Sequence, residues 1–378
     1  METKKWTQEE ILAIYHKPLL ELVFEAAAVH RRHHDPNKVQ ISSLISIKTG
    51  GCPEDCGYCP QAARYHTEVK MHELLPVHQV KAQALRAKQH GISRVCLGAA
   101  WRNVKDGEEF DQVLDMVRTV TKLDMEVCCT LGMLTENQAK RLEEAGLYAY
   151  NHNIDSSEDY YKEVISTRGF EDRLETIGNV RKTSITVCSG GIIGMGESVE
   201  DRCEMLRILA NMYPQPESVP INALVAVEGT PMEDQKPVSI FEMVRMVATA
   251  RIVIPETQVR LSAGRTSMSA EGQSLCFLAG ANSIFAGDKL LTTPNPDINE
   301  DKLLFKELGI VPQAPFEKHP KRPVVEKEDM TVLPKGENPR WTRPDHKIER
   351  NEAHRYKHAQ SDTSVKVALE NPAPKQVD

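Results

Sequence analysis

Short apolar runs alternate with longer amphipathic segments along most of this chain. Eight runs rich in apolar and β-branched residues predict strands, over 41–47, 94–97, 126–130, 149–154, 184–188, 218–223, 258–262 and 283–286. Between them apolar residues recur at helical spacing and predict helices, over 76–90, 108–122, 136–145, 170–182, 199–211 and 240–252. Strands that alternate with helices indicate parallel βα units.

Eight such units over roughly 250 residues match the α/β architecture of a (β/α)8 barrel of the TIM type. The same alternation would also fit an open, doubly wound parallel sheet, which is the alternative fold. Before the first strand, residues 7–34 alternate apolar and charged positions at helical spacing. They predict one or two N-terminal helices ahead of the barrel.

The composition changes near residue 312, so we expect a barrel domain over 1–312 and a tail over 313–378. The tail is rich in Pro, Lys, Glu and Asp and has few apolar residues. Such a segment cannot bury enough apolar surface to fold and is typical of disorder. The alternative is an extended segment that docks on the barrel through small anchors such as Trp341.

Composition and charge narrow the classes of function. The chain has 378 residues, a net charge of −7 and a pI of about 6.0, so it lacks the basic surface typical of nucleic-acid binding. No stretch of about 18 apolar residues predicts a membrane span, and the start METKKWTQEE lacks the apolar region of a secretory signal. Nine cysteines without an export signal indicate a reducing cytoplasm and metal chemistry.

Three of these cysteines form a motif with metal-ligand spacing. Cys52, Cys56 and Cys59 lie in the run KTGGCPEDCGYCPQ with spacing C-x3-C-x2-C. Three thiolates can hold three corners of a cubic iron–sulfur cluster, and the fourth iron then keeps an open position for a ligand. Tyr58 could cover that site. A zinc site, with a downstream histidine as fourth ligand, is the alternative.

Further polar and sulfur-bearing residues lie on or just after the later predicted strands. They are Cys96, Cys128, Cys129, Asn151, His152, Asn153, Asp155, Cys188, Asn222 and Arg260. A single strand cysteine is usually a small buried hydrophobe, whereas an arginine inside a strand needs a partner for its charge. Three strand cysteines and one arginine could therefore converge on a second iron–sulfur cluster inside the barrel.

Taken together, these runs carry a family resemblance. The three-cysteine motif, with an aromatic residue before its last cysteine, resembles the signature of the radical S-adenosylmethionine (SAM) enzymes. Within that superfamily, the ordered series KTGGCPEDCGYCPQ, GAAWRN, CTLGML, YNHNID, CSGGIIGMGE, PINALV and RLSAGR, between residues 42 and 287, resembles the biotin synthase family. The resemblance implies a sulfurtransferase that inserts sulfur into dethiobiotin in the last step of biotin biosynthesis.

Two clusters follow from this resemblance. Cys52, Cys56 and Cys59 match the ligands of a [4Fe-4S] cluster that cleaves SAM. A second set, Cys96, Cys128, Cys188 and Arg260, matches the ligands of a [2Fe-2S] cluster regarded as the sulfur donor. Cys128 is preferred to Cys129 because its distance to the TLG run fits the family pattern.

The resemblance also implies which residues contact SAM. Asn153 and Asp155 match residues that contact it, and Arg173 matches a residue near its carboxylate. The glycine-rich segment Gly190–Glu197, which contains Gly191, could approach the methionyl part of SAM closely, because glycine has no side chain. An ordinary loop after the fifth strand is the alternative interpretation of that segment.

The substrate and partners are expected on the same grounds. Asn153 and Asn222 offer both donors and acceptors, as the cyclic urea of dethiobiotin requires. The family further implies a flavodoxin- or ferredoxin-type electron donor, a homodimer and a cytoplasmic location.

Two other functions remain open at this point. One is another radical SAM reaction, which would not need the set Cys96, Cys128, Cys188 and Arg260. The other is a non-catalytic iron–sulfur or zinc protein, against which the YNHNID and glycine-rich runs argue.

Overall fold

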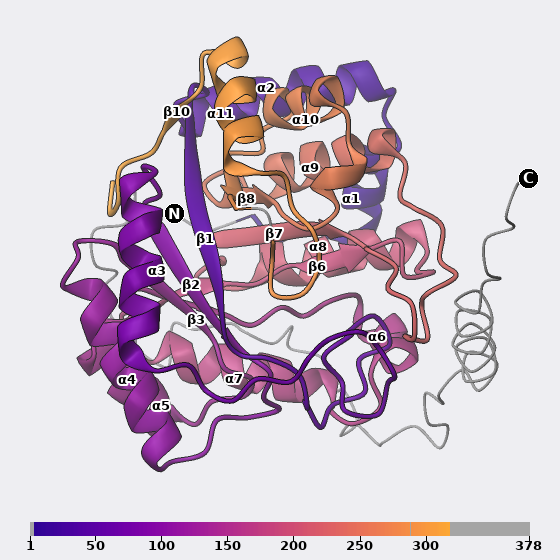
Figure 1. Cartoon of the computed structure of the whole chain (residues 1–378). Helices are drawn as coiled ribbons and strands as arrows, with labels where there is room; N and C mark the ends of the chain where they lie inside the picture. The colour runs from indigo at the N-terminus through magenta and orange to yellow at the C-terminus, as the bar shows by residue number, and fades with distance from the viewer. Residues whose placement is uncertain (1–3, 288, 318–378) are drawn as a thin grey trace, which may run out of the picture.

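Eight parallel strands close into a barrel in the computed structural model, which describes residues 4–287 and 289–317 (Figure 1). The strands are β1 (Lys38–Lys48), β2 (Arg94–Ala99), β3 (Glu126–Thr130), β4 (Ala149–Asn151), β5 (Thr186–Cys188), β7 (Ser218–Ala223), β8 (Gln258–Leu261) and β9 (Ser283–Phe285). Strand β1 pairs with β2 on one side and with β9 on the other, which closes the sheet. The predicted barrel is confirmed, and the open doubly wound sheet is wrong.

Two short strands were not predicted. β6 (Gly191–Ile193) pairs with β7, and β10 (Val311–Pro312) pairs with the start of β1. The fourth predicted strand, 149–154, ends at Asn151. The backbone after it leaves the strand and bonds to the C-terminal end of β5, where the His152 N–H donates to the Cys188 carbonyl over 2.9 Å.

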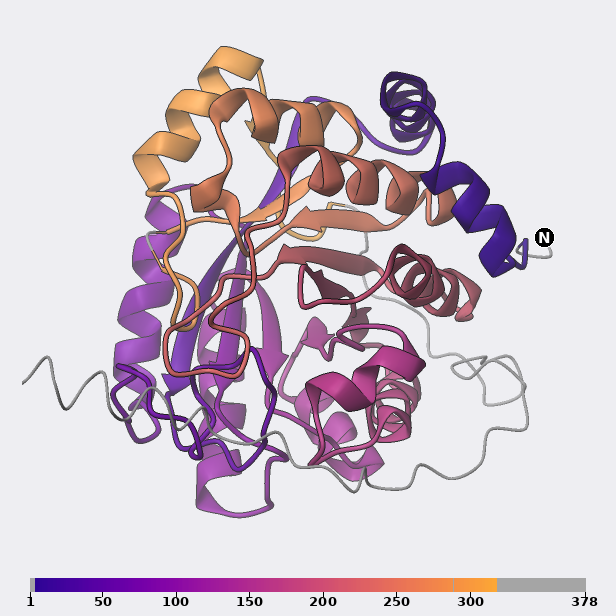
Figure 2. The ribbon, with the colours of Figure 1, turned by 90° about the vertical axis from the view of Figure 1, so that its right-hand side faces the viewer.

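Helices surround the strands as an outer layer (Figure 2). The six predicted between strands form as α3 (Val77–Gln89), α4 (Glu108–Thr121), α5 (Glu136–Glu144), α7 (Phe170–Arg181), α8 (Val199–Asn211) and α9 (Ile240–Val253). Three further α-helices, α6 (Glu158–Val164), α10 (Ala270–Leu278) and α11 (Ile298–Leu308), and a 3-10 turn, Arg265–Ser267, were missed.

The predicted N-terminal helices are α1 (Gln8–Tyr15) and α2 (Leu19–His33), and they pack on α8 and α9. Thr7 and Glu10 form a capping box that begins α1, and Pro18 precedes α2, where its missing N–H costs no helical hydrogen bond. The Trp6 indole N–H donates to the Val253 carbonyl over 3.1 Å, which ties the N-terminal segment to the end of α9.

Side chains alternate between two environments along each strand. On β3, Val127 and Cys129 point outward into the aliphatic shell between strands and helices, and Cys128 belongs to a separate group inside the barrel. The shell supplies most of the buried apolar area, so the interior is free to carry polar and sulfur-bearing side chains.

The first residues of the predicted tail lie against the floor of the barrel, at the N-terminal ends of the strands. The Gln313 N–H donates to the Val39 carbonyl over 2.9 Å, and the Phe316 N–H donates to the Glu126 carboxylate over 2.8 Å. The rest of the tail, with its predicted disorder, lies outside the described residues. Among the described helices none is long and apolar enough to span a lipid bilayer.

Gly132 provides a test of how tightly the loops at the mouth of the barrel pack. It has a φ of +79°, and a Cβ there would lie 2.3 Å from the Arg102 carbonyl oxygen. Gly91 has a φ of +78° but no heavy atom within 4 Å of such a Cβ. Gly91→Ala should therefore cost only the left-handed backbone strain, about 1 kcal/mol, and Gly132→Ala should lower the melting temperature further. Equal melting temperatures would contradict the close packing.

Candidate active site

The three cysteines of the motif lie on one tight turn that follows β1. The Cys59 N–H donates to the Cys56 carbonyl over 2.9 Å, and the Cys52 N–H donates to the Gln61 carbonyl over 3.0 Å. All three thiols are free, and that of Cys56 is buried. The turn stands at the C-terminal end of a strand, where barrel enzymes carry their chemistry.

Asp55 ties this turn to the segment after α6. Its carboxylate is fully buried and accepts hydrogen bonds from the backbone N–H groups of Ser166 (2.9 Å) and Thr167 (3.0 Å). Burial alone would raise the pKa of Asp55, but these bonds and the two hydroxyl groups outweigh it, so the pKa lies below its ordinary value. The carboxylate is thus a fixed anchor for the cysteine turn.

The donor set of the turn fits a cluster better than a single ion. Burial raises the pKa of the Cys59 thiol to about 12 and that of the Cys56 thiol well above its ordinary value, so the thiolates needed for ligation require a cation close by. Within residues 4–287 and 289–317 no three His, Cys, Asp or Glu side chains converge on one ion. In a cubic cluster each cysteine binds a different iron, so such convergence is not required. A zinc site does require several ligands around one ion, so the arrangement of these residues gives the zinc alternative no support.

Tyr58, Asp155 and Arg173 form a polar group beside the cysteine turn. The Tyr58 hydroxyl donates to Asp155 Oδ2 over 3.0 Å, and Arg173 forms an ion pair with the same oxygen. Asp155 is 1% exposed and has a φ of +68°, so its backbone occupies a conformation that few residues other than Gly, Asn and Asp adopt. The structure thus brings together three residues that the sequence placed far apart.

Gly191 allows two segments of the mouth to touch. A Cβ at this position would lie 2.5 Å from the Asp155 carbonyl oxygen and 2.1 Å from Met205 Sδ. The Ile192 N–H donates to that same carbonyl over 2.9 Å. The close approach that this glycine permits in the structure is therefore between β6 and the backbone of Asp155.

The two predicted asparagines also hold the mouth together. Asn153 accepts a hydrogen bond from the Gly190 N–H over 3.2 Å. Asn222 donates to the Gly191 carbonyl over 2.9 Å and accepts from the Ala263 N–H over 3.2 Å. Both side chains are half-buried, and each amide keeps hydrogen-bonding capacity for a ligand.

The second cysteine set lies on the inner wall of the barrel. Cys96 on β2 and Cys128 on β3 are direct neighbours in the sheet register, and their thiols pack together inside. The neighbouring Cys128 thiol, with the positive charges of Arg260 and Arg94, outweighs burial and lowers the pKa of Cys96 below its ordinary value. Cys129 points outward, where burial in aliphatic surroundings raises its pKa.

Arg260 on β8 faces this set and is 1% exposed. Its Nη1 lies 3.8 Å from Cys188 Sγ, and its Cζ lies 4.6 Å from the ring centroid of Phe285. The remaining hydrogen bonds go to neutral acceptors, Ser283 (2.9 Å), Gln40 (3.1 Å) and Ser42 (3.3 Å). Within the described residues it pairs with no carboxylate, so this buried cation needs a negative partner inside the barrel. Thiolates, or a cluster of net negative charge, would fit.

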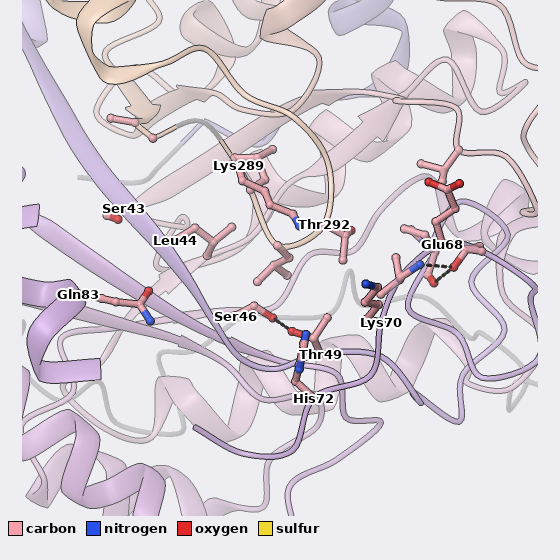
Figure 3. A pocket seen from close by; sticks show the side chains of 18 of the residues that line it. Ser43, Leu44, Ser46, Thr49, Glu68, Lys70, His72, Gln83, Lys289 and Thr292 are labelled. Carbon is pink, nitrogen blue, oxygen red and sulfur yellow. Dashed lines mark hydrogen bonds between the residues drawn. The ribbon is translucent and has the colours of Figure 1, made fainter. Parts of the chain in front are cut away.

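A cavity of about 1540 Å³ opens beside β1, and no cysteine of either set is among its described lining residues (Figure 3). Leu44 lines it and packs on the Cys96–Cys128 pair, and Pro60, the residue after Cys59, lines it too. Lys70, Lys289 and Thr292 add polar groups. Sequence reasoning missed Lys70, Lys289 and Thr292, because they lie in loops without a motif. The volume is ample for a small ligand beside a cofactor.

Two family models match the chain. Residues 46–209 match the radical SAM superfamily, and residues 220–311 match the biotin and thiamin synthesis associated domain. The first match begins in β1 and covers the three-cysteine turn, and the second covers β8 with Arg260.

Curated relatives agree with these matches. The chain is 73% identical to a biotin synthase of Flavobacterium johnsoniae over 352 residues, which are 93% of this chain and 97% of the relative. It is 57% identical to a biotin synthase of Nostoc punctiforme over 84% of this chain and 96% of the relative. A crystal structure of methylornithine synthase superposes with a TM-score of 0.70 at 19% identity, over 82% of this chain and 95% of that one. The last likeness concerns the fold.

Asp55→Ala tests the anchor of the cysteine turn. It removes the acceptor of two buried N–H groups and should lower the free energy of unfolding by on the order of 3 kcal/mol, measured by denaturant titration of the metal-free protein. Asp115→Ala breaks an exposed pair with Arg118 and should cost less than about 1 kcal/mol. Similar losses in the two variants would show that Asp55 is no special anchor.

Proposed function

The chain belongs to the biotin synthase family, and we propose that its two cysteine sets hold the two iron–sulfur clusters with which it converts dethiobiotin into biotin. It is a radical SAM enzyme that inserts sulfur, a sulfurtransferase reaction. This family membership decides against the other radical SAM reactions and the non-catalytic proteins considered above. What remains to be proposed is the role of each residue.

When bound, the [4Fe-4S] cluster supplies the electron that cleaves SAM to methionine and a 5′-deoxyadenosyl radical, and the [2Fe-2S] cluster supplies the sulfur. Cys52, Cys56 and Cys59 hold the first cluster. Their turn would give the cluster three thiolates and would leave a position open for SAM. Asp55 keeps the turn fixed on the segment after α6.

The neighbouring polar group binds SAM. Arg173 carries the positive charge suited to a carboxylate, and Asp155 offers a second oxygen to hydroxyl donors of the ribose. Tyr58 covers the turn and orients Asp155 through its hydroxyl group. Gly191 acts on this site by letting β6 pack against the Asp155 backbone, and it exposes no side chain that would narrow the approach of the methionyl part.

The second cluster is held by Cys96, Cys128, Cys188 and Arg260. The observation that carries this assignment is the buried Arg260, which donates toward the Cys188 thiol and otherwise only to neutral acceptors. A guanidinium in that setting compensates the negative charge of thiolates and sulfides. Because these donors come from packed strands, they keep the sulfur source inside the barrel and away from water.

Dethiobiotin lies between the two cysteine sets in this proposal. Asn153 and Asn222 offer amide groups to its cyclic urea. The cavity wall supplies cations, Lys70 and Lys289, for its carboxylate. A flavodoxin- or ferredoxin-type protein is proposed as the electron donor, with a homodimer in the cytoplasm as the working form, in keeping with the family.

An anaerobic assay tests the reaction. Protein reconstituted with iron and sulfide, then given SAM, dethiobiotin and a strong reductant, should form biotin and 5′-deoxyadenosine, both detected by mass spectrometry. Cys56→Ala should form neither product, because the first cluster loses a ligand. Undiminished 5′-deoxyadenosine from that variant would refute the assignment of the cysteine turn.

Neighbouring cysteines on β3 provide a matched pair for the second cluster. Cys128→Ala removes a thiol that points inward and should lose biotin and part of the bound iron, while 5′-deoxyadenosine still forms. Cys129→Ala removes a thiol that points into the aliphatic shell and should keep both products. The reverse pattern would transfer the ligand role to Cys129.

A further inference from the structure

Two buried polar side chains, Gln40 and Glu126, lie beneath the second cysteine set. They form a series of hydrogen bonds that leads from Glu126 through Gln40 to Arg260. Gln40 on β1 accepts from Arg260 Nη2 over 3.1 Å through its Oε1. Through its Nε2 the same amide donates to Glu126 Oε2, at the start of β3, over 3.3 Å. Gln40 is 3% and Glu126 1% exposed, so water does not compete for these bonds.

The chemistry of the two partners fixes the orientation of the Gln40 amide. A guanidinium only donates hydrogen bonds, and a carboxylate only accepts them. The amide has one end of each kind, so only one of its two orientations satisfies both neighbours. Glu126 holds the NH2 end and thereby turns the carbonyl oxygen of Gln40 toward Arg260. Without that carboxylate, the NH2 end would lose its acceptor, and the amide would be held from the guanidinium side alone.

Glu126 itself is fixed from two further sides. Arg94 Nε donates to its Oε2 over 2.7 Å, and the Phe316 N–H donates to its Oε1 over 2.8 Å. Phe316 belongs to the segment that closes the floor of the barrel, where its ring meets Tyr148 edge to face at 5.4 Å. These two hydrogen bonds fix the position of the Glu126 carboxylate, and its bond to Nε2 in turn fixes the Gln40 amide.

We propose that Gln40 is a positioning residue for Arg260, and that Glu126 sets the orientation of its amide. Held by Gln40 and Ser42 at Nη2 and by Ser283 at Nε, the guanidinium keeps Nη1 toward Cys188. In this proposal Gln40 acts through Arg260 and is not itself a ligand of the cluster. The inference rests on the proposed function, because it concerns Arg260 as a ligand of the second cluster.

The floor of the barrel offers a matched control. Gln258 on β8 is also a buried glutamine, 2% exposed, but its Nε2 donates to Gln313 Oε1 over 3.0 Å and it makes no hydrogen bond to Arg260. Gln40→Met and Gln258→Met therefore remove the same amide from the same region. If the floor is merely packed, the two variants should behave alike.

The experiment uses full-length protein carrying Cys56→Ala, so that the bound iron reports on the second cysteine set. The midpoint potential and the visible circular dichroism of the bound iron are measured for the parent and for added Arg260→Met, Gln40→Met and Gln258→Met. A nearby cation favours the more negative reduced cluster, so Arg260→Met should lower the midpoint potential. Gln40→Met should lower it by a smaller amount, and Gln258→Met should leave it unchanged.

A double variant completes the test. If Gln40 acts through Arg260, then Gln40→Met should add no shift once Arg260→Met is present. A Gln40→Met protein identical to the parent, or a Gln258→Met protein with an equal shift, would overturn the positioning role. If Gln40→Met does not fold, the shorter Gln40→Asn, whose amide ends one methylene short of Arg260, should give the same downward shift, and no shift would overturn the proposal. Absence of iron from the parent itself would instead refute the second cluster, and with it this inference.

Discussion

The pairing of β1 with β9 is the constraint on which both cysteine sets depend. In an open sheet, β1 and β8 would lie far from each other. Closure places Gln40 and Ser42 of β1 beside Ser283 of β9, within reach of Arg260. It also gathers the C-terminal ends of all strands in one ring, where the cysteine turn, Asp155 and Asn222 come together. The hydrophobic core is the aliphatic shell between strands and helices, so the interior of the barrel can hold polar and sulfur-bearing side chains.

The two cysteine sets are built in different ways. The turn at the mouth is held by loops, and its stability comes from a few buried polar anchors such as Asp55. The inner set is held by adjacent strands, and its geometry comes from the sheet register that pairs Cys96 with Cys128. A loop can adjust to a cofactor that arrives and leaves, whereas a strand wall offers donors with little freedom.

Much of this arrangement could be predicted from the sequence, because strand and helix periods are strong signals in βα units. The barrel, the cysteine turn and the inward position of Cys128 are consistent with patterns visible in the residues. Gln40 and Glu126 were missed, since a polar residue near a strand end carries no sign of which partner it will meet. Phe316 was assigned to a disordered tail, because composition averaged over 313–378 hides the few residues that dock. The division of the chain at residue 312 remains a prediction.

The distance along the chain between the partners of each site has a consequence for biosynthesis. All three cysteines of the turn have been made by residue 59, but Asp55 anchors the turn on Ser166 and Thr167, so it takes its final form only after residue 167. Arg260, by contrast, needs Gln40, 220 positions earlier, and Ser283, 23 positions later. Since domains fold as units after their strands are available, the inner set can take shape only when synthesis is nearly over. The cysteine turn can therefore be anchored before the hydrogen bonds around Arg260 can form.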